Sequence, residues 1–280
     1  MTTRLGSCRL VSNLGRMVQY LRQNSSVHSP GPELEIVRSF EHRETLSASD
    51  IVRLTGLSRS TVYRSLSILV RSDFLSRDQT RRRYLLGPRI LQLGMLARRR
   101  LAADTVVGPH LLKLHQQTRE TVTFSIVDGS HRLCVQVLEA ESELRQVAQA
   151  GTRYPLHLGA AGKVIIAHMD RAVASLVLQN QGVLPGEVHQ AFRALDKIRR
   201  QGYAVTVGER VPGVCAAAAP VFLQGVVYGS VAVAGPRDRM RKALGSIIPL
   251  VVGAARMLPL EILSSTAETT TTKKPGDGAR

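Results

Sequence analysis

The stretch LSASDIVRLTGLSRSTVYRSLSILVRSDFL, residues 46–75, predicts two short helices joined by a tight turn. Ser47 can cap the first helix, and Asp50, three residues later, completes a capping box. Gly56 suits the turn because glycine readily adopts a positive φ, and Ser58 can cap the second helix. Helix pairs of this kind are typical of DNA-binding domains.

The two helices are expected to pack through apolar residues at helical spacing, with Ile51 and Leu54 on the first and Val62, Leu66 and Leu69 on the second. The start of the second helix then directs hydroxyl and guanidinium groups outward, and such groups bond phosphates and base edges in a DNA major groove. The residues expected to contact DNA there are Ser58, Arg59, Ser60, Thr61, Tyr63 and Arg64.

A hairpin is predicted directly downstream, with strands at 74–77 and 83–86 around a short turn. Arg81, Arg82 and Arg83 lie at or beside its tip. A helix pair alone would fit the corner of any globular core, but such a corner has no use for three adjacent guanidinium groups. We therefore expect a winged helix-turn-helix whose three arginines contact DNA phosphates or the minor groove.

Positive charge is concentrated in the first part of the chain. Of the net charge of +17, residues 1–100 carry +11, with 18 arginines and no lysine against 7 acidic residues. A domain of that charge gains affinity for a polyanion by releasing condensed counterions, and arginine adds bidentate bonds to phosphate and guanine. The expected partner is double-stranded DNA, since no basic amphipathic helix indicates a membrane surface.

Length and composition fit two domains, because 280 residues with 44% hydrophobic content can form two cores. Cys8, Cys134 and Cys215 lie far apart, so neither a disulfide framework nor a zinc site is expected. No run approaches the roughly 18 apolar residues of a membrane helix, and no secretory signal is evident. These features predict a cytoplasmic protein without a membrane span.

The hydrophobic pattern of the second half of the chain differs from that of the first half. Strands are predicted at 122–127, 133–138, 144–148, 213–222 and 226–234, and helices at 160–169, 172–179, 189–201 and 247–258. Strands at both ends with helices between them indicate an α+β domain around one antiparallel sheet.

Two series of residues recur in the same order in one protein family. The first series is Leu46-Ser47, Thr55-Gly56-Leu57, Ser60-Thr61-Val62, Arg64-Ser65-Leu66, Leu69 and Tyr84-Leu85-Leu86-Gly87-Pro88. The second is Pro155-Leu156-His157, Ala161-Gly162-Lys163, Gly202-Tyr203-Ala204-Val205, Glu209, Pro212-Gly213-Val214, Ala218-Ala219-Pro220-Val221 and Gly235-Pro236. Over roughly residues 33–262 the chain therefore resembles the IclR family of bacterial transcriptional regulators.

The resemblance implies a winged helix-turn-helix domain at 33–87, a linker helix at 88–105 and a GAF-like α/β effector-binding domain at 106–262. Composition adds a flexible extension at 1–32 and a disordered tail at 263–280. The resemblance also implies a homodimer or homotetramer that responds to a small-molecule effector. The apolar stripe of the linker helix is either packed on its own domain or a dimer seam.

The resemblance places the effector site between the helix that starts at Ala160 and the sheet. Its expected residues are Leu158, Gly159, Ala160, Gly162, Thr206, Ala216, Ala232 and Ala234. Thr206 replaces a frequent acidic residue of the family, and the three alanines replace cysteine and hydroxyl residues. Because burying an unpaired polar group costs about a kilocalorie per mole or more, methyl groups there would favour a less polar ligand. Tighter strand packing is the alternative.

The segment Gly159-Ala160-Ala161-Gly162-Lys163 lacks the spacing and the following Ser or Thr of a phosphate-binding P-loop. Its helix start is instead expected to offer free N–H groups to a ligand carboxylate. No H-E-x-x-H or G-x-S-x-G pattern supports enzymatic or metal chemistry, so no catalytic residue, cofactor or metal is expected.

We expect a ligand-responsive transcriptional regulator that binds a pseudo-palindromic operator as a dimer. The working hypothesis is a repressor, although repressors and activators share these residues. One alternative is a constitutive DNA-binding protein whose C-terminal domain only oligomerises, and another is an enzyme with an appended DNA-binding module.

Overall fold

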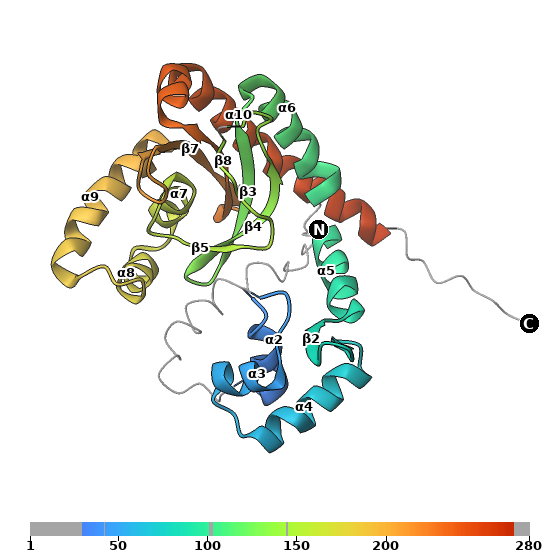
Figure 1. Cartoon of the computed structure of the whole chain (residues 1–280). Coiled ribbons are helices and arrows are strands. Elements are labelled where there is room, and N and C mark those ends of the chain that lie inside the picture. The colour runs from blue at the N-terminus through green and yellow to red at the C-terminus, as the bar shows by residue number, and fades with distance from the viewer. Residues whose placement is uncertain (1–29, 42, 101–102, 144, 272–280) are drawn as a thin grey trace, which may run out of the picture. The chain divides into compact units, whose positions relative to one another are not determined.

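The computed structural model describes residues 30–41, 43–100, 103–143 and 145–271 (Figure 1). These residues form two compact units, and the division between the units falls after Arg100. Three predicted features lie outside the described residues: residues 1–29 of the extension predicted at 1–32, Cys8, and residues 272–280 of the predicted tail.

The first unit contains four helices and one hairpin among its described residues. They are α2 (Pro32–Arg38), α3 (Ala48–Thr55), α4 (Arg59–Arg71), β1 (Leu75–Asp78), β2 (Arg83–Leu86) and α5 (Pro88–Arg100). The strands pair antiparallel, and Leu46 adds a bridge to the hairpin through two main-chain bonds with Tyr84. The architecture is a winged helix-turn-helix, as predicted.

The predicted caps define where α3 and α4 begin. The Ser47 hydroxyl accepts a bond from the Asp50 N–H, and the Asp50 carboxylate accepts one from the Ser47 N–H, so the capping box is complete. Gly56 ends α3 with a φ of 70°, in the left-handed region. Ser58 caps α4 by accepting from the N–H of Thr61.

The core of the first unit corrects one predicted apolar contact. Val62, Leu66 and Leu69 are buried as predicted, but Leu54 is 45% exposed. The inward side of α3 is formed by Ile51 with its partly buried neighbour Val52, because this short helix meets the core along a narrow strip.

The second unit is built on one antiparallel sheet in the order β5-β4-β3-β8-β7-β6. The strands are β3 (Thr121–Asp128), β4 (His131–Leu138), β5 (Arg153–Pro155), β6 (Ala204–Val207), β7 (Val214–Leu223) and β8 (Val226–Pro236). The helical segments are η1 (Ala103–Val107), α6 (Gly108–Thr118), α7 (Ala160–His168), α8 (Arg171–Asn180), α9 (Pro185–Gln201) and α10 (Arg237–Thr271). The expected α+β architecture is confirmed.

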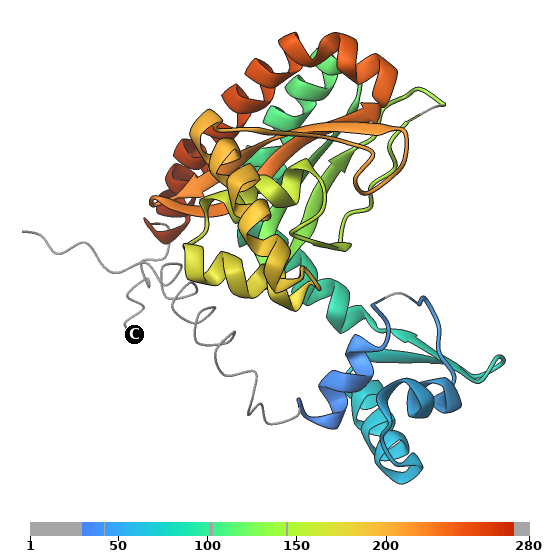
Figure 2. The same ribbon diagram turned by 90° about the vertical axis from the view of Figure 1, so that its left-hand side faces the viewer.

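Helices cover both faces of this sheet (Figure 2). Helices α6 and α10 share a core with alternate residues of β7 and β8, among them Val221 and Val233. On the other face, α7, α8 and α9 share a second core with Ala218 and Ala232. Because these inward residues are alanines, the α7 main chain can approach the sheet closely.

Three segments of the second unit differ from the prediction. No strand forms at 145–148, the described part of the strand predicted at 144–148, where the Gln146 carbonyl accepts a bond from the Thr121 hydroxyl instead of entering a ladder. The edge strand is β5, which pairs with β4 and ends at Pro155, a residue that an edge tolerates because it needs no ladder N–H. Strand β6 was not predicted.

The last helix is much longer than predicted. Helix α10 begins at Arg237 rather than near 247 and continues to Thr271, through the first part of the predicted disordered tail. By length and composition, Arg237–Pro259 could cross a membrane, with a mean hydropathy of 1.3. Its buried residues Met240, Ile247 and Val251 lie in the core against the sheet, so packing accounts for part of this apolar character.

The linker helix predicted over 88–105 is described only in part, because residues 101–102 lie outside the described residues. Helix α5 covers Pro88–Arg100, and the π-helical segment η1 covers Ala103–Val107. The contact-based division assigns α5 to the first unit and η1 to the second.

Candidate functional site

The start of α4 presents a polar surface in the first unit. Arg59 and Arg64 are exposed, and Tyr63 is 56% exposed. The Ser58 hydroxyl lies 2.9 Å from that of Ser60 and 2.8 Å from that of Thr61. The structure therefore brings all six predicted residues of this helix together on one helix start.

Buried contacts behind this surface fix the position of α4. The sequence did not single out Ser65, which is buried and donates to the Glu33 carboxylate of α2 at 2.7 Å. This hydrogen bond is the main cause that lowers the pKa of Glu33. A buried serine one residue after Arg64 thus anchors the helix whose outer side is exposed.

The three hairpin arginines have different environments. Arg81 and Arg82 are exposed in the turn, and the Arg81 N–H donates to the Asp78 carboxylate at 3.0 Å. Arg83 lies in β2, donates to the Thr45 hydroxyl at 2.9 Å and to the Thr45 carbonyl at 3.2 Å, and lies 3.6 Å from the Asp50 carboxylate. Arg83 therefore has a structural role, because it ties the start of β2 to the segment before α3.

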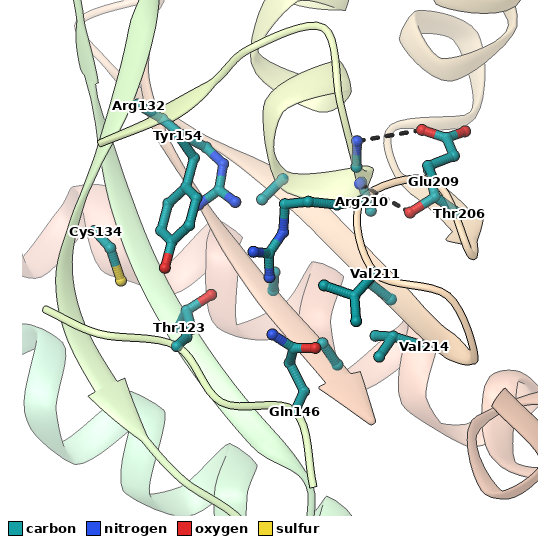
Figure 3. Close-up of a pocket in the computed structure, with 17 residues that line it drawn as sticks. Thr123, Arg132, Cys134, Gln146, Tyr154, Thr206, Glu209, Arg210, Val211 and Val214 are labelled. Atoms are coloured by element: carbon teal, nitrogen blue, oxygen red, sulfur yellow. Dashed lines mark hydrogen bonds between the residues drawn. The ribbon is translucent and has the colours of Figure 1, made fainter. Parts of the chain in front are cut away.

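A cavity of about 60 Å³ opens in the second unit between the start of α7, the sheet and the loops beside it (Figure 3). Its lining residues are Thr123, Arg132, Cys134, Gln146, Ala148, Tyr154, Gly159, Ala160, Ala161, Thr206, Glu209, Arg210, Val211, Val214, Ala216, Ala232 and Ala234. Six of the eight residues predicted for the effector site are among them.

Leu158 and Gly162 do not line the cavity. Gly162 is buried, and a Cβ atom at this position would lie 2.3 Å from the Leu156 carbonyl oxygen. Glycine is needed there because the helix packs against the main chain that precedes it, which sequence spacing could not distinguish from ligand contact.

The start of α7 is already occupied by the protein's own acceptors. The Gly159 N–H donates to the Glu209 carboxylate at 3.2 Å, and the Ala160 N–H donates to the Thr206 hydroxyl at 3.0 Å. The Glu209 carboxylate also pairs with Lys163. The expectation of free N–H groups at this helix start is therefore wrong for these two donors.

The cavity also contains two arginines that the sequence analysis missed. Arg132 of β4 is only 6% exposed, donates to the Ser125 hydroxyl at 2.9 Å and stacks on the Tyr154 ring at 4.6 Å. Arg210 stacks on the same ring at 4.8 Å. Burial, together with the positive charge of Arg210, lowers the pKa of Arg132 to about 10, so Arg132 remains charged at neutral pH.

This finding corrects the interpretation of a site lined by methyl groups. Alanines form part of the wall, but the same cavity holds two guanidinium groups and the Gln146 amide. A signal existed in the sequence, because Arg132, Cys134 and Gln136 alternate with apolar residues and place an arginine on one face of a strand.

Comparison with known proteins identifies the family. Residues 34–79 match the IclR helix-turn-helix domain, and residues 96–259 match the C-terminal domain described as "Bacterial transcriptional regulator IclR C-terminal". The chain belongs to the IclR family. This IclR protein is accordingly a DNA-binding transcriptional regulator with a helix-turn-helix and a C-terminal ligand-binding domain.

Relatives of this IclR protein align along most of their length. The chain is 29% identical over 226 residues to the glycerol operon regulatory protein of Streptomyces griseus, covering 78% of this chain and 87% of that protein. It is 29% identical over 201 residues to the HTH-type transcriptional repressor AllR of Escherichia coli, covering 69% of this chain and 74% of that protein.

A solved structure shares the fold. An IclR homologue from Microbacterium hydrocarbonoxydans, complexed with 4-hydroxybenzoate, superimposes with a TM-score of 0.74 at 22% identity, covering 84% of this chain and 98% of that one.

In the described ranges, no group of three or more His, Cys, Asp or Glu residues could hold a metal ion. Cys134 and Cys215 are free and buried, and burial raises the pKa of both thiols. A thiol with a raised pKa is a poor nucleophile at neutral pH, so neither group suggests covalent chemistry.

Proposed function

We propose that this IclR protein is a repressor that binds a pseudo-palindromic operator as a dimer and responds to a small organic effector held in the cavity of its second unit. The observation that carries the proposal is the polar cavity between the start of α7 and the sheet, in the domain that the family uses as a ligand-binding module. The homologue complexed with 4-hydroxybenzoate supports a small organic ligand for a fold of this kind.

DNA contact is assigned to the start of α4 and the tip of the hairpin. Arg59, Tyr63 and Arg64 are exposed on a helix whose other side is anchored in the core, which suits insertion into a major groove. Exposed Arg81 and Arg82 suit contacts with phosphates or the minor groove.

Dimerisation is assigned to α5. Leu91 is 67%, Met95 60% and Leu96 51% exposed, so this helix does not bury its apolar residues within its own unit. An isolated soluble helix with such exposed residues favours a partner, and a second copy of α5 is the simplest one. This favours a dimer seam over a connector packed on its own domain.

The sign of regulation is proposed from a relative. The Escherichia coli protein at 29% identity is named a repressor. An effector can release such a repressor from DNA only if it binds better to the dimer arrangement that fits the operator poorly.

Selection of DNA from a random duplex pool with the full-length protein tests the operator and the dimer together. We expect the enriched sequences to be inverted repeats, with half-sites about one helical turn or a multiple apart. Enrichment of one unrepeated half-site, bound by a monomer, would refute the dimer.

Screening small organic compounds against full-length protein tests effector control. A true effector should raise the melting temperature of the protein, because it binds the folded state, and should also change its affinity for the selected operator. A compound that stabilises the protein without any change in operator affinity would favour a constitutive DNA-binding protein instead.

A further inference from the structure

The cavity of the second unit has an excess of positive charge. Its charged lining residues are Arg132, Arg210 and Glu209, and the Glu209 carboxylate is paired with Lys163. Across the described part of the chain, no carboxylate lies within ion-pair distance of either arginine. Two guanidinium groups thus share one tyrosine ring without a negative partner (Figure 3).

The buried charge of Arg132 has few favourable contacts to offset its loss of hydration. It is 6% exposed, and its Nε atom is buried without a hydrogen-bond partner in the structure. A buried charge is costly unless it is paired, and removing a charge from water costs several kilocalories per mole. The Ser125 hydroxyl and the face of Tyr154 supply only part of that compensation. The arrangement lacks an acceptor with negative charge.

The sheet order separates the charged and the apolar parts of the cavity. Arg132 and Tyr154 come from β4 and β5 at one edge of the sheet, whereas Ala232, Ala234 and Ala216 come from β8 and β7. Strand β3 lies between them and contributes Thr123. Since neighbouring strands lie about 4.8 Å apart, β4 and β8 are separated by roughly 10 Å across the cavity floor.

The start of α7 does not compete for the negative group. The Gly159 and Ala160 N–H groups already donate to Glu209 and Thr206. The Glu209 carboxylate would moreover repel a second carboxylate at that helix start. An anion entering the cavity therefore has its favourable partners at the arginine end.

We propose that the effector is a small organic carboxylate whose charged group binds Arg132 and Arg210 beside Tyr154, and whose apolar body extends toward Ala216, Ala232 and Ala234. This inference rests on the proposed ligand site in the second unit and assigns its charge preference to the two arginines. Arginine suits this role because its planar fork binds a carboxylate through two hydrogen bonds.

The test compares matched charged and neutral compounds with the full-length protein. The probes are acetate, butyrate and benzoate, each paired with its amide, together with inorganic phosphate, all at constant ionic strength. Melting temperature and calorimetry measure binding without DNA. We expect at least one carboxylate to bind and its amide, which has nearly the same shape, not to bind measurably.

Variants assign the binding to the arginines. Arg132→Gln and Arg210→Gln should each weaken binding of the carboxylate about 10- to 100-fold, the range for loss of a charge-assisted hydrogen bond. Arg171→Gln is the matched control, because Arg171 also stacks on an aromatic ring, Phe192 at 4.4 Å, but lies outside the cavity lining. Arg210→Gln keeps the test decisive if Arg132→Gln does not fold.

Each outcome decides the proposal. Equal binding of carboxylates and amides, undiminished binding by Arg210→Gln, or binding of phosphate and no carboxylate would overturn it, as would failure of the whole panel to bind. If a carboxylate binds through the arginines but leaves operator affinity unchanged, the anion site stands and the proposed regulation fails.

Discussion

Removing the two exposed arginines of the hairpin turn should weaken DNA binding in a salt-dependent manner. Arg81 and Arg82 are exposed at the hairpin tip, whereas Arg83 is tied to Thr45 and lies near Asp50. The wing should therefore lose two phosphate contacts in the double variant Arg81→Ala/Arg82→Ala. Each contact contributes about 0.9 to the slope of log affinity against log salt, so the slope should flatten by roughly 1.8.

That slope sets the size of the effect at a given salt concentration. At about 0.1 M salt the double variant should bind DNA roughly 60-fold more weakly than the wild type, and the ratio should fall about 12-fold between 50 and 200 mM. Fluorescence anisotropy with one labelled duplex, measured over this salt range, gives both slopes. The contact is sequence-independent, so an arbitrary duplex suffices.

The control removes the same amount of charge elsewhere. Arg38→Ala/Arg71→Ala deletes two exposed arginines of the first unit that lie outside the predicted DNA-contacting set. Its slope should change much less than that of the hairpin variant. Parallel salt plots for the wild type and the hairpin variant would refute the wing contact and leave Arg81 and Arg82 as solvated charges.

Three further predictions concern single residues. Arg59→Ala should cost about 1–3 kcal/mol on the selected operator if Arg59 reads a base, and an equal loss on all duplexes in the anisotropy assay would show a phosphate contact instead. Gly162→Ala should lower the free energy of unfolding, because its methyl group would be forced against the Leu156 carbonyl. Such overpacking typically costs about 1–3 kcal/mol, which exceeds the gain of about 1 kcal/mol from alanine in a helix. An unchanged urea denaturation curve would contradict this packing role. The Ser47 hydrogen bonds lower the pKa of Asp50, so its carboxylate stabilises the fold above the unfolded pKa near 3.9, and this contribution is lost as the pH falls through the lower folded pKa. The stability difference between wild type and Asp50→Asn should therefore shrink in acid, and a difference constant with pH would exclude the capping box as its cause.

Local signals predicted most of the first unit. The helix ends depend on side chains that act on main-chain groups within a few residues. Ser47 and Asp50 define the start of α3, Gly56 its end and Ser58 the start of α4, so sequence spacing alone predicts these boundaries. Leu54 was assigned to the wrong face because a short helix offers little periodicity from which to orient it.

The cavity was predictable only in part. The resemblance located Thr206 and the alanines, but Arg132, Tyr154 and Arg210 come from two strands and a loop far apart in sequence. Their meeting depends on β5 pairing beside β4, and that edge strand was not predicted. The occupied start of α7 likewise depends on Glu209, 50 residues beyond Gly159.

Two sets of bonds connect strand β2 of the hairpin to the residues just before α3: those from Arg83 to Thr45 and the main-chain bonds between Leu46 and Tyr84. These bonds hold the wing to the helix pair, so we expect the two to move as one piece. The distance between the hairpin turn and the start of α4 would then be nearly constant. A duplex whose grooves do not match this distance must itself bend or twist so that both elements can contact it. Base steps that neither element touches would then influence binding through the energy needed to deform them.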